Sequence, residues 1–352
     1  MKKITKGSIT AVGLAGLLIV TGFGALPTKA SAQKASKNLV VVSWGGTFQD
    51  TQQQAFFTPF QKSTGINVQV ENPVNLAKLK SMEMNGHVQW DVLDLLGTDV
   101  PVAASQGLLA PINYNIVKKN QFLKGAAGKY GVVEDYYSTV LGWNPSSIKG
   151  TPKSWADFFN LKKFPGERGL EQSPVGTLEI ALLADGVKPK NLYPLNVNRA
   201  LKKLSTLKGN IQWWSQGAQP VQDLISGQVV MSSVWNGRIA AAINEGGTLK
   251  YTYNQGLLNN EDWVVAKNAP DIQNAMKFIQ FASNAQPLSV LAKGTQYGPA
   301  NIKALDLLSP SFAKTLPTSK MNYSKQVVIN VNWWAKNFNR VNAQFQAWLL
   351  KQ

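Results

Sequence analysis

The feature that most constrains the fold is a regular alternation of strand-like and helix-like segments in the first third of the chain. Residues 39–42 are a continuous apolar run, residues 66–70 and 91–96 are further strand-like segments, and helical spacing fills the segments between them. This alternation predicts a doubly wound sheet covered by helices on both faces. Such sheets bind ligands beyond the carboxyl ends of their strands, so Trp44 and Thr98, each just past a strand, are expected near a cleft.

A second set of strands and helices begins near residue 137. Residues 137–144 alternate and end at a proline, residues 229–235 form another strand, and residues 263–265 are expected to return to the first sheet. The chain is longer than a single core usually organises. Two α/β lobes joined by more than one crossing segment form a hinge that closes on a ligand. We therefore predict a two-lobed α/β protein, each lobe a doubly wound sheet, with the ligand cleft at the hinge.

The N-terminus predicts export. Three lysines in the first six residues precede an uncharged apolar stretch over residues 11–26, and Ala30-Ser31-Ala32 is a small-x-small triplet. These features are typical of a cleaved signal peptide, here residues 1–32. A membrane anchor is the alternative, but the stretch contains four glycines and is short for a span of about 20 strongly apolar residues.

The chain contains no cysteine. This excludes disulfides, thiolate metal sites, a cysteine nucleophile and a lipid-modified cysteine at the cleavage site. An exported binding protein without a lipid anchor is retained only where a second membrane encloses it. The expected location is therefore the periplasm.

The formal net charge is +17, of which residues 1–32 contribute four lysines and no acids. A nucleic-acid partner is not expected, because the lysines are dispersed and no basic run is interleaved with aromatic residues. The positive charge is expected to form a solvated surface. It opposes capture of a polycation unless local acids line the ligand site.

Residues for covalent chemistry are sparse. His87 is the single histidine and lies in a turn-like context, and neither a G-x-S-x-G elbow nor a phosphate-binding loop is present. We expect no catalytic residue, metal ligand or cofactor. A carboxylate-based hydrolase or lyase stays open as an alternative, because Glu171 with Glu179 and Glu261 with Asp262 could act in pairs.

Eleven tryptophans and one arginine are the best candidates for a binding site. Trp44 and Trp235 end apolar strand runs, where their rings could hold methylene chains and ammonium groups, although core packing is an equal alternative. The pairs at 213–214 and 333–334 each leave one candidate, taken as Trp214 and Trp334. Arg238 follows Trp235 closely and could offer a planar fork to a carboxylate.

Several segments, in this order, resemble the spermidine/putrescine-binding periplasmic proteins of ABC importers. They are Ser43-Trp44, Thr64-Gly65-Ile66-Asn67-Val68, Asp91-Val92 with Gly107-Leu108, Ser154-Trp155-Ala156-Asp157, Trp235-Asn236-Gly237 and Tyr297-Gly298-Pro299-Ala300-Asn301. The resemblance covers nearly the whole mature chain and implies the type II periplasmic-binding-protein fold. It assigns residues 33–142 plus 266–305 to one lobe and 143–265 plus 306–352 to the other.

The resemblance also implies roles for individual residues. Trp44 and Trp235 match the tryptophans that sandwich an aliphatic ligand in this family, and Tyr297 matches a tyrosine of the cleft. Glu261 matches a carboxylate that binds an amine, and Trp334 lies near the position of a polar residue of the family.

Departures from the family pattern concern the ligand. The second acidic cluster of the family aligns with Gln172, Ser173 and Gly176, and only Glu171 lies close. Arg238 would repel an ammonium group, so a zwitterion such as an ω-amino acid fits better than a polyamine.

The expected function is capture of a small amine-containing or zwitterionic solute by a monomer that delivers it to an ABC permease. Binding of an opine, a sugar or a peptide is the alternative within the same class.

Overall fold

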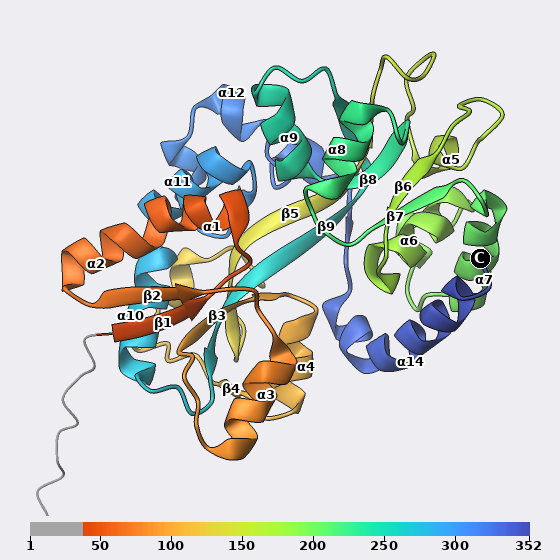
Figure 1. The fold of residues 1–352 in the computed structure, drawn as a ribbon. Coiled ribbons are helices and arrows are strands. Elements are labelled where there is room, and N and C mark those ends of the chain that lie inside the picture. Colours follow the sequence, from red (N-terminus) through yellow and green to blue (C-terminus); the bar gives the residue numbers. More distant parts are fainter. Residues whose placement is uncertain (1–37) are drawn as a thin grey trace, which may run out of the picture. The chain divides into compact units, whose positions relative to one another are not determined.

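The computed structural model describes residues 38–352, so the predicted signal peptide lies outside the described residues. The described residues form one mixed sheet of eleven strands flanked by helices (Figure 1). The main strand order is β2-β1-β3-β9-β5-β8-β6-β7; β10 pairs with β5, and β4 and β11 pair with β9. The strands are β1 Asn38–Val42, β2 Asn67–Glu71, β3 Val92–Leu96, β4 Leu109–Ala110, β5 Gly131–Trp143, β6 Arg168–Glu171, β7 Ile211–Trp214, β8 Met231–Trp235, β9 Lys250–Ala266, β10 Gly298–Pro299 and β11 Val327–Val328.

Helices follow most of the strands. The α-helices are α1 Gly46–Gln52, α2 Thr58–Thr64, α3 Leu76–Asn85, α4 Asp99–Ser105, α5 Trp155–Phe158, α6 Pro174–Ala184, α7 Val197–Leu204, α8 Gln219–Ser226, α9 Asn236–Asn244, α10 Ile272–Ala282, α11 Ala285–Thr295, α12 Pro310–Ala313, α13 Lys320–Tyr323 and α14 Val331–Leu349. A π-helical turn, η1 Gln53–Phe57, joins α1 to α2. Short 3₁₀ turns are η2 Lys119–Gln121, η3 Pro189–Asn191, η4 Ser205–Leu207 and η5 Leu305–Leu307.

The first three strands form the parallel sheet that the alternation predicts. β1 pairs in parallel with both β2 and β3. The chain leaves α2 at Gly65, which adopts the left-handed conformation (φ 72°) that lets a glycine end a helix at no steric cost. The carboxyl ends of these strands therefore lie at one edge, as a parallel arrangement requires.

Two long antiparallel strands connect the two ends of the sheet. β5 has 13 residues and β9 has 17, and they run side by side through its middle (Figure 1). The expected segments at 137–144 and 263–265 are only parts of these strands. The sequence pattern predicts only a small part of β9, because residues 250–262 are largely polar and show no clear alternation. The two predicted sheets thus share β5 and β9 and form one continuous sheet.

Apolar cores lie at both ends of this sheet. One is rich in phenylalanine around Phe56, Phe60 and Phe278, and another surrounds Trp155 and Leu182. Cores of this kind hold the helices against the sheet. The predicted lobes, 33–142 plus 266–305 and 143–265 plus 306–352, stay a prediction.

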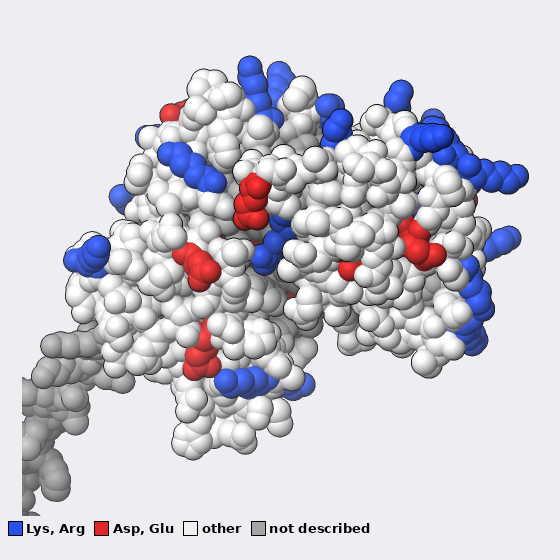
Figure 2. All heavy atoms as spheres, turned by 45° about the horizontal axis from the view of Figure 1, so that its top comes forward, with Lys and Arg blue, Asp and Glu red and all other residues white. Residues whose placement is uncertain are grey.

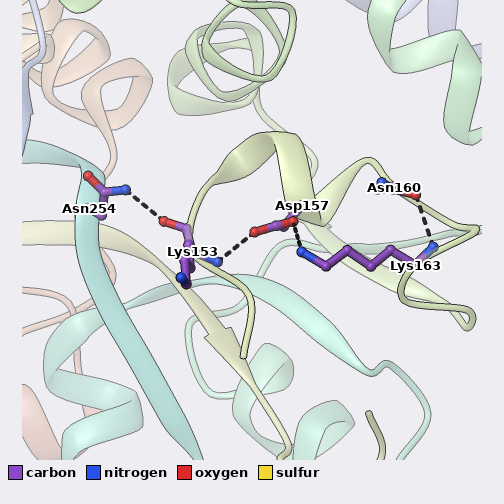
Figure 3. Close-up of polar contacts among 5 residues, drawn as sticks. All are labelled: Lys153, Asp157, Asn160, Lys163 and Asn254. Carbon is purple, nitrogen blue, oxygen red and sulfur yellow. Dashed lines mark hydrogen bonds and ion pairs between the residues drawn. The ribbon is translucent and has the colours of Figure 1, made fainter. Parts of the chain in front are cut away.

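A set of polar contacts ties α5 to β9 (Figure 3). Asp157 accepts a hydrogen bond from the Lys153 backbone N–H at 2.8 Å. It also forms an ion pair with Lys163 Nζ at 2.8 Å. The side chain of Asn254, in β9, donates to the Lys153 carbonyl at 2.7 Å. A carboxylate in the first helical turn that binds an N–H group before it stabilises the start of the helix.

Basic side chains are dispersed over the surface, as the sequence predicts. In Figure 2, Lys and Arg side chains lie in separate groups over the face shown, one of them at its middle, and form no continuous band. Within residues 38–352, no helix has both the length and the apolar character needed to cross a membrane.

Candidate functional site

A cavity of about 290 Å³ lies at the carboxyl ends of β1, β6 and β8. Trp44 follows β1, Glu171 ends β6 and Trp235 ends β8, as the strand-end rule predicts for ligand sites. The lining residues are Trp44, Phe48, Pro73, Leu96, Tyr137, Glu171, Ser215, Gln216, Gly217, Trp235, Arg238, Glu261 and Tyr297. Six of the nine predicted site residues therefore meet in one cavity: Trp44, Glu171, Trp235, Arg238, Glu261 and Tyr297.

A larger cavity of about 460 Å³ involves the same two long strands through Tyr136, Leu258 and Asn260. Successive residues of a strand point to opposite faces, so this cavity lies on the other face from Tyr137 and Glu261. Its lining contains Lys124 but no carboxylate. It lacks the pairing of acid and guanidinium groups that distinguishes the smaller cavity.

Aromatic rings build the walls of the smaller cavity. The Trp235 ring packs edge-on against Tyr137 at 5.9 Å and against Trp214 at 5.8 Å. Tyr297 packs against Phe48 at 5.8 Å and Tyr137 at 5.7 Å. Because each ring holds its neighbour, the indole and phenol faces are fixed before a ligand arrives.

Gly217 approaches the Trp235 ring too closely for any side chain. A Cβ atom at residue 217 would lie 2.4 Å from Cζ3 of Trp235. The loop after β7 can therefore cover this ring only because residue 217 is glycine.

Two carboxyl groups face the cavity. Glu261 is 8 % exposed. Burial raises its pKa well above the usual value, Asp94 and Asp135 raise it further, and Arg238 opposes them. Burial also raises the pKa of Glu171 to about 7, against a lowering by the Trp235 indole. Both acids are thus poised to exchange a proton when a charged group enters.

The Trp-Asn-Gly-Arg segment forms the end of β8 and the first turn of α9. The Asn236 side chain accepts from the Ser138 backbone N–H at 2.8 Å and donates to the Gln296 carbonyl at 2.9 Å. Gly237 is required because a Cβ there would lie 2.2 Å from the Thr295 carbonyl oxygen. These contacts fix the turn that carries Arg238 to the cavity.

Arg238 contacts both sides of the site. Its Nη1 donates to Oγ1 of Thr47 at 2.8 Å, and it lines both the cavity and a neighbouring hollow of about 180 Å³. Basic and acidic groups lie next to one another in the hollow at the middle of Figure 2.

Three predicted residues do not line the cavity. Trp214 is buried and supports Trp235 from behind. Thr98 precedes α4 and is absent from the lining. Trp334 is buried in a core, where its Nε1 donates to Glu179 Oε1 at 2.7 Å. The adjacent tryptophans at 333 and 334 lie in helix α14, whose buried face includes Trp334, Val341 and Phe345.

Sequence reasoning missed Phe48, Tyr137 and the loop 215–217 as lining residues. The loop directly follows β7, so the strand-end rule that selected Trp44 could also have selected it. Tyr137 gave no such signal, because it lies in the middle of β5. Residues 38–352 hold no group of three or more His, Asp or Glu side chains suited to a metal ion.

A mixed α/β sheet with a fixed aromatic cavity at its strand ends, holding acid and guanidinium groups, defines a ligand-binding protein. The chain belongs to the bacterial extracellular solute-binding protein family, whose model matches residues 55–318. It is therefore a solute-binding protein and not an enzyme, as predicted.

Known relatives agree with this class. The chain is 39 % identical to the gamma-aminobutyric acid-binding protein of Pseudomonas aeruginosa, over 91 % of this chain and 93 % of that protein. The solved structure of a GABA receptor has a TM-score of 0.84 at 39 % identity, covering 88 % of this chain and 97 % of that one. AgtB of A. tumefaciens, solved with agropinic acid, has a TM-score of 0.81 at 37 % identity, covering 89 % and 98 %. The predicted type II periplasmic-binding-protein fold is confirmed.

The resemblance to polyamine-binding proteins holds at greater distance. The spermidine/putrescine-binding periplasmic protein of Salmonella typhimurium is 23 % identical over 93 % of this chain and 95 % of that protein. The family model and the 39 % identical relative confirm the solute-binding family, whereas polyamine specificity is not confirmed.

Proposed function

We propose that this chain captures an ω-amino acid of the γ-aminobutyrate class in the periplasm and delivers it, as a monomer, to the membrane subunits of an ABC importer. The observation that carries the proposal is the presence of Glu261 and Arg238 in the lining of one aromatic cavity. A 39 % identical relative named as a gamma-aminobutyric acid-binding protein and a solved structure named as a GABA receptor support it.

The chemistry of the lining suits a zwitterion. Glu261 would bind the ammonium group, Arg238 would bind the carboxylate through its planar fork, and Trp44 and Trp235 would flank the methylene chain. A polyamine offers a second ammonium group where Arg238 lies. Two positive charges 4 Å apart repel by about 4 kcal/mol at an effective dielectric of 20, so a diamine should bind more weakly.

Closure of two lobes would bury the ligand and create the surface that a permease binds. Thr47 and Arg238 belong to different predicted lobes, and their hydrogen bond would favour the closed form. Signal-peptide removal after residue 32 would release the mature chain into the periplasm.

Titration calorimetry of refolded, ligand-free mature protein tests the proposal. We expect γ-aminobutyrate to bind at least about tenfold more tightly than putrescine or spermidine, a difference of about 1.4 kcal/mol. Tight binding of spermidine without binding of γ-aminobutyrate would contradict it.

An opine is a second candidate, because a 37 % identical structure is named as a complex with agropinic acid. The cavity of about 290 Å³ is at the small end for ligand sites and favours the smaller ω-amino acid. The same titration with an opine distinguishes the two.

A further inference from the structure

Glu261 is one member of a buried group of four acids, Asp94, Glu134, Asp135 and Glu261, here called the acidic core. Asp135 in β5 lies opposite Glu261 in β9, and Asp94 in β3 lies opposite Trp263, two residues further along β9. Paired residues of adjacent strands project from the same face, so Asp94, Asp135 and Glu261 share one face of the sheet. Glu134 joins them at an irregularity in the pairing between Val133 and Asp135.

The Gln52 side chain donates hydrogen bonds to two members of the acidic core. Its Nε2 donates to Asp94 Oδ2 at 2.9 Å and to Glu134 Oε1 at 3.0 Å, while its Oε1 accepts from the Ser43 hydroxyl. Ser43 directly precedes the cavity residue Trp44. The acidic core is therefore connected to the ligand cavity both through Glu261 and through this short polar chain.

Several carboxyl oxygens of the acidic core have no hydrogen-bond partner within residues 38–352. Both oxygens of Asp135, which is 1 % exposed, belong to this set, as do Asp94 Oδ1 and Glu261 Oε2. A buried carboxylate without donors costs several kcal/mol, and this cost disfavours the charged form of Asp135 most, because neither of its oxygens is paired. Burial is the main cause that raises the pKa of Glu134 and Glu261. Repulsion from Asp94 and Asp135 raises both pKa values further.

Other charged and titratable groups surround the acidic core, on the strands and helices that pack against it. Asp262 in β9 adds negative charge, and Arg238 in α9 adds positive charge that acts on Glu261. Tyr137 and Tyr297 lie close, and burial raises the pKa of both phenols well above the usual value, so they stay neutral. Glu171 ends β6 on the cavity wall and is the other acid able to release a proton there.

We propose that the acidic core holds protons in the empty protein and releases one to solvent when the ligand's ammonium group reaches Glu261. The inference rests on the proposed function and assigns Asp94 and Asp135 as further residues that determine selectivity for a cationic group. In the step, one carboxyl O–H bond breaks, the proton passes to bulk buffer, and the carboxylate pairs with the ammonium ion. Neutral analogues that lack the amine gain nothing from this exchange.

Because the bound state holds fewer protons than the empty state, affinity rises with pH while the acidic core titrates. Release of one proton corresponds to about a tenfold gain per pH step of one over that range.

The first experiment needs no ligand. Infrared spectra of the empty protein at neutral pH should contain the C=O stretch of protonated carboxylic acids. We expect Asp135→Asn to weaken this band and Asp50→Asn, at an exposed acid of α1 two residues before Gln52, to leave it unchanged. Absence of the band in the wild type would overturn the proposal.

The second experiment measures the released proton. Calorimetry with γ-aminobutyrate in two buffers of different ionisation enthalpy should give release of about one proton per ligand. We expect Asp135→Asn to reduce this release and Glu171→Gln to leave most of it. Release that disappears in Glu171→Gln and persists in Asp135→Asn would assign the proton to the cavity wall and reject the acidic core. If γ-aminobutyrate does not bind, the proposed function fails, and the infrared spectra still decide whether the acidic core holds protons.

Discussion

Arg238 Nη1 donates a hydrogen bond to Thr47 Oγ1 at 2.8 Å, although the two residues are 191 positions apart in the sequence. The bond joins the first turn of α9 to α1. Since Arg238 also lines the aromatic cavity, one guanidinium group can hold a ligand carboxylate and join the opposite wall. The two roles are separable by substitution.

Thr47→Val should weaken binding of the ω-amino acid by about threefold to tenfold, because it removes one exposed hydrogen bond and keeps both volume and cation. The loss should come mainly from faster dissociation, measured by stopped-flow tryptophan fluorescence. Thr206→Val, an exposed threonine of η4, is the matched control. An unchanged dissociation rate would mean that the bond contributes nothing to closure.

Arg238→Gln should weaken binding of γ-aminobutyrate by about 100-fold, because a charge-assisted hydrogen bond to the carboxylate is lost. The same change should improve binding of putrescine, since the repelling cation is gone. Calorimetry with both ligands checks this reversal. A loss of affinity for both ligands alike would indicate that Arg238 only supports the shape of the cavity.

Residues that end strands could be predicted, whereas those that depend on pairing register could not. Trp44 and Trp235 lie at strand ends, and a strand end is visible in a local pattern, whereas Glu171 was selected through the family resemblance. Trp334 was a weaker candidate than the tryptophans at strand ends, and its environment depends on which face of α14 packs inward.

The acidic core shows the same limit. Asp94 and Asp135 come from different strands, and only the register with β9 brings them beside Glu261. That register could not be read because β9 itself is largely polar. Burial of these acids also runs against the usual preference of carboxylates for the surface, so composition gave no signal.

Gly217→Ala should reduce ligand affinity by more than about tenfold, because the new Cβ forces the Trp235 ring out of its position against Tyr137. Calorimetry measures the affinity, and the tryptophan emission of the empty protein reports the displaced ring. In a Trp235→Phe background the two indole atoms that clash, Cζ3 and Cε3, are absent, so the alanine should cost much less there. Equal costs in the two backgrounds would show that residue 217 acts through the loop backbone instead.

Asp262 should make the empty protein less stable as the pH rises. Burial raises its pKa to about 7, although the Asn260 amide lowers it, whereas an unfolded aspartate titrates near 3.9. The folded state thus binds more protons between about pH 4 and pH 7, and the stabilisation is lost as the pH rises through that window. Asp262→Asn mimics the protonated acid, so its free energy of unfolding should match the wild type near pH 4 and exceed it by a few kcal/mol at pH 8. Urea denaturation of both proteins and of Asp306→Asn, an exposed control, measures the difference. A variant that is less stable than the wild type at pH 8 would show that Asp262 is ionised and satisfied in the folded protein.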